Sequence, residues 1–219
     1  MPRQPQEVAD SEYVVGLPLV GAVAAQVEAI YLASFPAAER EPFATIVQGV
    51  QAGSRWLCCA RVGGRVVGFA LISPLPRARV ALLDFLATEA AIRGRGVGRK
   101  VVETVAQHLR GDPEMLAMLI EAETDAIGSP EERHLKARRI GFYQRLGAIP
   151  VVAVTDYRLP NMAGGDSVAM RLLWLPLTAS AAVPRGAELR QLLVTIYADG
   201  YGRGIDDPLV QMVLSSIRE

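Results

Sequence analysis

The residues best suited to bind a ligand form a loop rich in glycine and arginine, Arg93-Gly94-Arg95-Gly96-Val97-Gly98-Arg99-Lys100. An apolar run at residues 80–87 precedes the loop, and apolar residues at helical spacing follow it over residues 97–109. This order predicts a strand, a glycine turn and the first turn of a helix, where backbone N–H groups have no intrahelical partner. The helix dipole and the arginine charges strengthen the attraction for anions there. The loop therefore predicts a site for a pyrophosphate or a similar anion.

Two common phosphate-binding motifs do not match this loop. A Walker A loop needs four residues between its first Gly and a Gly-Lys pair, followed by Ser or Thr, whereas Gly98 is followed by Arg-Lys-Val. A dinucleotide fingerprint, Gly-x-Gly-x-x-Gly, fails as well. Started at Gly94 it ends on Arg99, and started at Gly96 it ends on Val101. A nucleotide-binding module is therefore disfavoured.

The loop resembles the coenzyme A loop of the GNAT acyltransferases, Arg/Gln-x-x-Gly-x-Gly/Ala, whose three fixed places are taken here by Arg93, Gly96 and Gly98. Residues 141–148, Gly-Phe-Tyr-Gln-Arg-Leu-Gly-Ala, resemble the second hallmark of that family, a helix ending in Tyr-x-x-x-Gly before a strand. Two hallmarks in the right order are far more specific than either alone. The resemblance covers roughly residues 56–154.

The resemblance implies that acetyl-CoA is bound as acyl donor, without a metal. It implies that the backbone of Leu86, Ala87 and Thr88 polarises the thioester carbonyl and aligns the pantetheine, which is electrostatic help of the oxyanion-hole kind. The loop would hold the pyrophosphate, with a binding set made up of Arg93, Gly94, Arg95, Gly96, Val97, Gly98 and Arg99. The alternative is that the loop is only a tight, solvated turn.

Tyr143 matches the family's general acid, which protonates the thiolate that leaves. A phenol with a pKa near 10 is protonated at neutral pH and can donate. The alternative is a core tyrosine on the apolar stripe of its helix, together with Leu135, Phe142 and Leu146. The family usually has Asn and a small residue where this chain has Lys136 and Arg139.

Three carboxylates are candidates for the base that takes the proton of the amine. Asp84 lies in an otherwise apolar strand, on the alternating face where the histone-acetylating branch of the family carries its base. Glu121 and Glu123 end the next strand on one common face. For each of them, the alternatives are an anchor for a substrate charge and an ordinary acid at a strand end. Many enzymes of the family have no strong single base.

Two charged segments allow two interpretations each. The loop at residues 35–41 falls where the family builds its acceptor wall, so Glu39, Arg40 and Glu41 either contact a charged substrate or form a solvated connection. The basic residues of the helix before Tyr143 either face the 3′-phosphate of coenzyme A or, as we expect for most of them, form a solvated helix face; they are Arg133, Lys136, Arg138 and Arg139.

Composition favours a soluble enzyme. The 219 residues are 51% hydrophobic, which is enough for a sizeable core, and the 23 basic residues equal the 23 acidic ones. This balance argues against a nucleic-acid partner, and the chain contains no apolar run long enough to span a membrane. The start is polar, without the apolar segment of a signal peptide, so a cytoplasmic location is expected. The adjacent Cys58 and Cys59 are expected to be apolar strand residues, and the two histidines, His108 and His134, lie too far apart in sequence to indicate a metal site.

Periodicity predicts the elements. Strands are expected at residues 13–17, 56–62, 66–72, 80–87, 115–122, 151–158 and 168–174. Helices are expected at residues 19–33, 43–50 and 97–109, from Ser129 as cap to Gly147, and at residues 188–197 and 208–217. Residues 1–12 are predicted to be disordered, 13–177 to form the acetyltransferase domain, and 178–219 to be a helical extension packed on it, joined by a linker at 179–183.

The resemblance and the pattern together predict an α/β, GNAT-like acyl-CoA N-acyltransferase fold. A mixed, mostly antiparallel sheet would carry helices on both faces, and acyl-CoA would enter a wedge between the strands starting at Val80 and Met115. The expected reaction moves an acetyl group to a primary amine of a small molecule by direct attack. The alternatives are a protein or peptide amine as acceptor, a different acyl group, or a non-catalytic acyl-CoA sensor. We expect the segment 178–219 either to cap the acceptor site or to form a homodimer surface.

Overall fold

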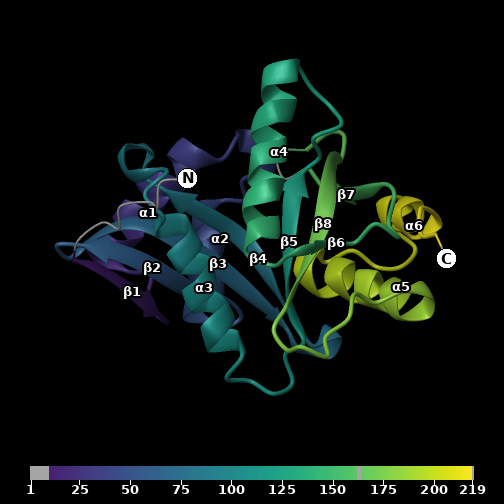
Figure 1. The fold of residues 1–219 in the computed structure, drawn as a ribbon, viewed down its shortest axis with the longest axis horizontal. Helices are drawn as coiled ribbons and strands as arrows, with labels where there is room; N and C mark the ends of the chain where they lie inside the picture. Colours follow the sequence, from purple (N-terminus) through teal and green to yellow (C-terminus); the bar gives the residue numbers. More distant parts are fainter. Residues whose placement is uncertain (1–9, 162–163, 219) are drawn as a thin grey trace, which may run out of the picture. The chain divides into compact units, whose positions relative to one another are not determined.

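The computed structural model describes residues 10–161 and 164–218 (Figure 1). The chain forms two compact units, one made of Met1–Pro74 and Leu83–Asp112, the other of Leu75–Leu82 and Pro113–Glu219. Residues 1–9 of the segment predicted to be disordered lie outside the described residues. The first strand begins at Ser11, two residues before the predicted start at residue 13.

The first unit is built on strands in the order β1-β2-β3-β4. The strands are β1 (Ser11–Val15), β2 (Trp56–Val62), β3 (Arg65–Leu75) and β4 (Val80–Thr88). The predicted hairpin is present, since β2 and β3 pair antiparallel from Trp56↔Ile72 to Val62↔Arg65 across the Gly63-Gly64 turn. β1 adds to β2, also antiparallel.

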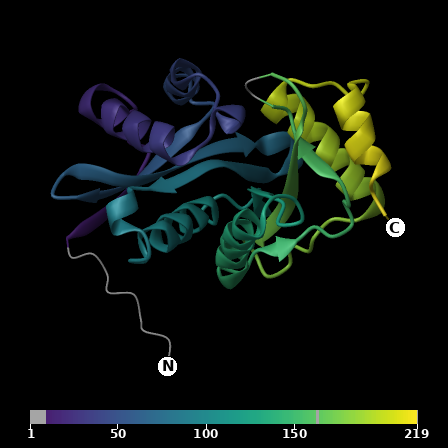
Figure 2. The same ribbon diagram turned by 90° about the horizontal axis from the view of Figure 1, so that it is seen from above.

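Helices cover both faces of the sheet of the first unit (Figure 2). One face carries α1 (Gly21–Ser34), the 3-10 turn η1 (Ala37–Glu39) and α2 (Phe43–Gln51). The opposite face carries α3 (Val97–Leu109), which follows the 3-10 turn η3 (Ala90–Ile92). The core under α1 and α2 takes alternate residues of the hairpin, such as Leu57, Cys59, Phe69 and Leu71.

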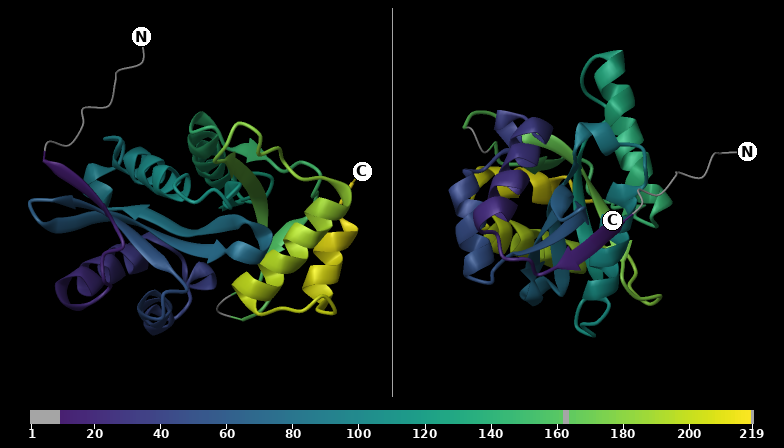
Figure 3. Two further views of the ribbon diagram at one scale, coloured as in Figure 1. Left: turned by 90° about the horizontal axis from the view of Figure 1, so that it is seen from below. Right: turned by 90° about the vertical axis from the view of Figure 1, so that its left-hand side faces the viewer.

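The second unit is built on β5 (Ala117–Glu123), with the strand order β5-β8-β6. Both β6 (Ile149–Pro150) and β7 (Tyr157–Leu159) pair antiparallel with β8 (Val168–Pro176), as does β5. The helix α4 (Pro130–Arg145) covers one face, and α5 (Gly186–Thr195), the π-helical turn η4 (Ile196–Gly200) and α6 (Pro208–Ser215) cover the other (Figure 3, left). Residues 80–82 of β4 and the 3-10 turn η2 (Pro76–Ala78) also belong to this unit.

The segment 178–219 shares a core with the strands of the second unit. Leu189 and Leu193 of α5 and Val210 and Val213 of α6 are buried together with Leu119 and other residues of β5 and β8. Each Å² of apolar surface removed from water stabilises the folded state by about 25 cal/mol, so such a shared core is the main contribution to the stability of this unit. Within the described residues, no helix has both the length and the apolarity that crossing a bilayer requires.

One prediction about the second unit is wrong. Residues 151–158 do not form one strand, because after β6 the chain turns, leaves Val152 78% exposed and brings Val154 into a bridge with Ile217. Only Tyr157–Leu159 returns to β8. The residues at 179–183 join β8 to α5 without regular secondary structure, as predicted for a linker. This linker is packed, because Ala181 is buried and its carbonyl accepts a hydrogen bond of 3.0 Å from the Trp174 indole N–H.

Candidate active site

The glycine–arginine loop has the geometry of an anion cradle. After η3, both Gly94 (φ 80°) and Gly96 (φ 83°) adopt the left-handed conformation that favours glycine, and Gly96 is the N-cap of α3. No side chain of the described residues caps this helix end. The helical bonds begin with the Lys100 N–H donating to the Gly96 carbonyl at 3.0 Å. The N–H groups of the preceding first-turn residues thus have no helical acceptor. A Cβ at Gly94 would meet no atom within 4 Å, so the loop is open to a ligand.

The arginines of this loop are exposed, and two of them have partners. Arg93 donates from Nε to the Thr88 carbonyl at 3.4 Å. Arg99 Nε lies 2.7 Å from Glu103 Oε1, one helical turn along α3. Free N–H groups, the dipole of a helix of 13 residues and exposed guanidinium groups together favour the binding of an anion such as a diphosphate.

The end of β4 requires a glycine beside it. A Cβ at Gly68 of β3 would lie 2.9 Å from Thr88 Cγ2 and 3.1 Å from the Ala87 carbonyl oxygen. The Glu89 N–H donates to the Val67 carbonyl at 2.9 Å, which ties the end of β4 to β3. Leu86 and Thr88 are half-buried and Ala87 is buried. The predicted donor-binding residues of β4 and of the loop thus follow one another in the first unit.

Tyr143 is a buried residue of α4. The helix starts at the predicted cap, where Ser129 and Glu132 form a capping box with Pro130 at the first position. The Tyr143 ring meets Phe142 edge-on at 5.0 Å between centroids. Burial raises the pKa of its phenol to about 12, which keeps it protonated at neutral pH. The predicted apolar stripe is incomplete because Leu135 is 60% exposed.

Asp84 lies beside a cation in the first unit. Its carboxylate accepts a hydrogen bond of 2.6 Å from the Ser73 hydroxyl, and Oδ2 lies 3.7 Å from Nε of Arg55. Arg55 also forms an ion pair with Glu41, which is only 8% exposed. Although burial opposes its charge, the carboxylates of Asp84 and Glu41 raise the pKa of the Arg55 guanidinium. In the loop at residues 35–41, the carboxylate of Glu41 thus belongs to a buried ion pair and not to a solvated connection.

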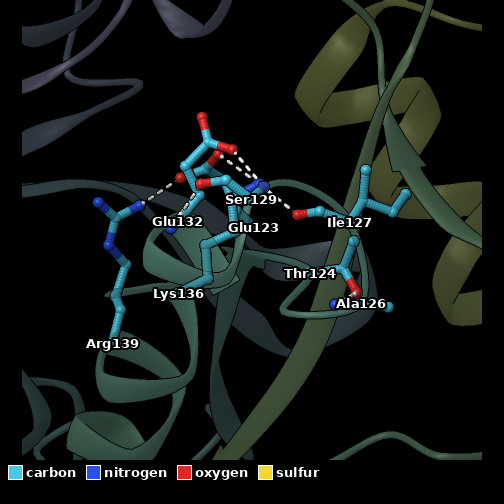
Figure 4. A network of polar contacts seen from close by, with 8 residues as sticks. All are labelled: Glu123, Thr124, Ala126, Ile127, Ser129, Glu132, Lys136 and Arg139. Carbon is cyan, nitrogen blue, oxygen red and sulfur yellow. Dashed lines mark hydrogen bonds and ion pairs between the residues drawn. The ribbon is translucent and has the colours of Figure 1, made fainter. Parts of the chain in front are cut away.

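Glu123 is held by the two residues at which the helix departs from the family pattern. Arg139 and Lys136 approach its carboxylate at 2.9 and 3.5 Å (Figure 4). Lys136 also donates to the Ile127 carbonyl at 3.1 Å. Among the predicted basic run, these two residues are therefore engaged by Glu123, while Arg133 and Arg138 are exposed.

Glu121 has partners of a different kind. The hydroxyls of Tyr157 in β7 and Tyr201 beyond η4 donate to its two carboxylate oxygens. In residues 10–161 and 164–218, no arginine or lysine forms an ion pair with Glu121. Burial raises the pKa of this carboxyl to about 7, although both phenol hydrogen bonds oppose the rise.

No motif in the sequence indicates the partners of these carboxylates. Arg55 lies in a turn before β2 and Tyr201 in a glycine-rich turn, and neither stands in a motif. The strand predicted at residues 151–158 includes Tyr157, but nothing in the sequence pattern relates Tyr157 to Glu121. The sequence indicates only that a carboxylate in an apolar strand needs polar partners, without indicating which residues they are.

The cysteines are inert strand residues. Burial raises the pKa of both thiols to about 12, which leaves little thiolate at neutral pH. Cys59 joins the core under α1 and α2, whereas Cys58, which follows the opposite side of the pleat, does not belong to that cluster. Within the described residues, no group of His, Cys, Asp and Glu is arranged to hold a metal ion.

Comparison with known proteins gives one family. Residues 24–148, more than half of the chain, match the sequence model of the acetyltransferase (GNAT) family. No curated protein sequence matches significantly. Among solved structures, a Bacteroides thetaiotaomicron protein whose name assigns it to the GNAT family has a TM-score of 0.67 at 18% identity, covering 88% of this chain and 99% of its own.

Two further structures show the same fold. One is yncA from Salmonella typhimurium, determined with its cofactor acetyl-CoA, with a TM-score of 0.56 and 14% identity over 80% of this chain and 98% of its own. The other is Ard1 from Thermoplasma volcanium, with a TM-score of 0.55 and 22% identity over 78% and 99% of the two chains. At these identities the similarity concerns the fold alone.

Proposed function

Because the chain belongs to the GNAT family of acetyltransferases, we propose that it transfers an acetyl group from acetyl-CoA to a primary amine of a small molecule. The observation that carries this proposal is the open, glycine-lined N-terminus of α3 with its exposed arginines. That site suits the diphosphate of coenzyme A, and the structure of yncA with acetyl-CoA supports the same donor.

In this proposal the first unit binds the donor. The N–H groups and guanidiniums of the loop hold the diphosphate, and the backbone of Leu86, Ala87 and Thr88 aligns the pantetheine and polarises the thioester carbonyl. Binding energy from these parts of coenzyme A, which do not react, orients the thioester for attack. The nearby glycine Gly68 keeps β3 and β4 close enough to hold that backbone in place.

The reaction needs one proton acceptor and one proton donor. The amine nitrogen attacks the thioester carbonyl carbon and forms the new C–N bond, after which the C–S bond breaks. The proton that the amine loses passes to a carboxylate of the protein. The leaving thiolate takes its proton from the phenol of Tyr143, whose raised pKa of about 12 keeps it in the donor form.

The proposed donor is tested by the thermal midpoint of the protein with coenzyme A, acetyl-CoA, ATP and NAD. A ligand that binds the native state raises the midpoint, so we expect a rise with the two coenzyme A compounds. A larger rise with ATP or NAD, or none with coenzyme A, would overturn the proposal. Thiol release is then measured with small primary amines and with peptide N-terminal amines, which separates the two acceptor classes.

Tyr143→Phe tests the proposed acid. Loss of a general acid should reduce kcat by about a hundredfold or more, while the midpoint rise with acetyl-CoA stays close to that of the wild type. Phe142→Leu is the matched control, because it changes the neighbouring ring but no hydroxyl. Equal activity of Tyr143→Phe and the wild type would remove the tyrosine from the mechanism. Binding of acetyl-CoA without thiol release with any amine would indicate a sensor instead of an enzyme.

A further inference from the structure

The carboxylate of Glu121 is held by hydroxyls from two segments that are distant in the sequence. Tyr157, which donates to Oε1, belongs to β7, and Tyr201, which donates to Oε2, follows the π-helical turn η4 in the C-terminal segment. A carboxylate offers about four acceptor positions, so two phenols leave room for a further proton. Glu121 and Tyr201 both keep partial solvent exposure, so neither residue is fully enclosed by the core.

The surroundings of Glu121 are apolar apart from these hydroxyls. On its face of β5 it stands beside Leu119 and opposite Leu172 of β8, and α5 and α6 add apolar side chains to the same core. Besides its two partners, the charged and titratable groups described on this side include Tyr197 of η4, the Asp156 and Arg203 charges that act on Tyr197, and Glu123, which is paired with Lys136 and Arg139.

This choice of partners matters for proton transfer. An arginine paired with a carboxylate occupies its oxygens, so an amine must compete with that ion pair to reach them. Asp84 lies beside Arg55, and Glu123 is paired with Arg139. A phenol fixes the position of a carboxylate oxygen but adds no positive charge. Of the three candidate carboxylates, Glu121 is the one suited to accept a proton near neutral pH.

The two tyrosines that hold Glu121 pack against a third, Tyr197. Tyr157 and Tyr197 are 2% and 0% exposed, and the centroid of the Tyr197 ring lies 6.0 Å from that of Tyr157 and 5.9 Å from that of Tyr201. The Tyr197 hydroxyl donates to the Arg158 carbonyl rather than to Glu121. The Arg203 N–H donates to the Tyr197 carbonyl at 2.9 Å, which closes the turn that carries Tyr201. Single π-helical turns inside helices are frequent at functional sites.

We propose that Tyr157 and Tyr201 are positioning residues that hold Glu121 to take the proton of the acceptor amine, and that the C-terminal segment thereby completes the acceptor side of the enzyme. This inference rests on the proposed acetyl transfer. In the step itself, the ammonium form of the acceptor loses one N–H proton to a Glu121 oxygen, which frees the nitrogen lone pair for attack. The carboxyl returns that proton to water. The second N–H proton, which the nitrogen gives up after the attack, replaces the proton that the Tyr143 phenol gave to the thiolate, so both residues are regenerated.

The test compares Tyr201→Phe and Tyr157→Phe with Tyr197→Phe, which removes a hydroxyl from the same cluster but no bond to Glu121. Loss of a hydrogen-bond donor to the ionised carboxylate should raise the pKa of Glu121, and so shift the acid limb of the pH profile of kcat to higher pH by about 1 unit. At pH 7 the ionised fraction would then fall from about one half to about one tenth, and kcat about fivefold, with little change in KM for the amine. Tyr197→Phe should leave the limb in place.

A second measurement needs no substrate. The side-chain carboxyl of Glu121, labelled with ¹³C and assigned by its disappearance in Glu121→Gln, is titrated by NMR in the same variants, each first shown to be folded by its circular dichroism. We expect the midpoint to rise in Tyr157→Phe and Tyr201→Phe and to stay unchanged in Tyr197→Phe.

The outcomes separate the inference from the proposed function. Acetyl transfer by the wild type with an unmoved acid limb in both Tyr157→Phe and Tyr201→Phe would overturn the inference alone. A moved NMR midpoint without any acetyl transfer by the wild type would overturn the proposed function, and the inference with it. If the variants change the pH dependence of KM for the amine but not that of kcat, Glu121 is an anchor for the substrate charge and the inference is wrong.

Discussion

Replacing Glu121 by Gln should stabilise the folded protein at pH 8 relative to pH 5, although it removes the proposed base. Burial among apolar side chains raises the pKa of this carboxyl from its ordinary value of 4.5 to about 7. The unfolded chain therefore gives up the proton at lower pH than the folded chain. Between these two values the folded state binds more protons, so the free energy of unfolding falls as the pH rises.

The magnitude follows from the two pKa values. The full interval from 4.5 to about 7 corresponds to about 3 kcal/mol, at about 1.4 kcal/mol for each pH unit. The stability linked to this proton is fully present below pH 4.5 and is lost as the pH rises through about 7. Integrating only from pH 5 to pH 8 gives about 2.5 kcal/mol. A glutamine of similar shape has no such proton and avoids this loss.

The assay is urea unfolding of the wild type and Glu121→Gln at pH 5 and pH 8, with the difference between the two proteins taken at each pH. The contributions of other titrating groups are the same in both proteins and cancel in this difference. A bond that the amide fails to make lowers the stability of the variant equally at both pH values, so it does not affect the change with pH. We expect it to move in favour of the variant by about 2.5 kcal/mol between the two pH values. A difference that stays constant within about 0.5 kcal/mol would refute the reasoning, because the carboxyl would then not be held in a desolvated site.

Tyr201→Phe supplies a control with the opposite sign. Removing one donor makes the ionised carboxylate still less favourable, so the loss of stability between pH 5 and pH 8 should become larger by about 1 kcal/mol. In the Glu121→Gln background the same substitution should no longer alter the pH dependence. Persistence of the effect in that background would show that Tyr201 acts on another group.

Two further predictions concern the first unit. Arg55→Met should lower the free energy of unfolding by about 3–5 kcal/mol in urea unfolding at pH 7, because Glu41 and Asp84 lose their shared cation; a loss below about 1 kcal/mol would contradict this. Glu103→Gln should tighten coenzyme A binding up to about fivefold in titration calorimetry by releasing Arg99, whereas Arg99→Gln should weaken it. Equal affinities for the two variants would exclude Arg99 from the site.

Local pattern was enough to predict most of the elements. The hairpin of β2 and β3, the strand before the glycine loop, the helix after it and the capping box at Ser129 all depend on residues a few positions apart. The failed strand at residues 151–158 shows the limit of this approach. Its β-branched residues satisfy the strand pattern, but Val152 points to solvent and Val154 pairs with Ile217, a contact set by the far end of the chain.

The candidate site was predicted only as far as its motifs reach. The loop and Tyr143 stand in recognisable spacing, whereas the three carboxylates could not be ranked from the sequence. What distinguishes them is the chemistry of their partners, and the Tyr201 hydroxyl that holds Glu121 lies 80 residues away along the chain. Such a pairing depends on β7 and η4 both meeting β5 and β8, which no local pattern encodes.

The partners of Glu121 also explain why an unfavourable feature is present in a core. A carboxylate among Leu119, Leu172 and the helices of the C-terminal segment destabilises the fold above neutral pH, and an apolar residue or an amide there would not. An arginine partner, such as Arg55 beside Asp84, would offset the cost but would occupy the carboxylate oxygens with an ion pair. Two phenols satisfy the carboxylate oxygens and preserve basicity, so the arrangement is better suited to proton transfer than to stability.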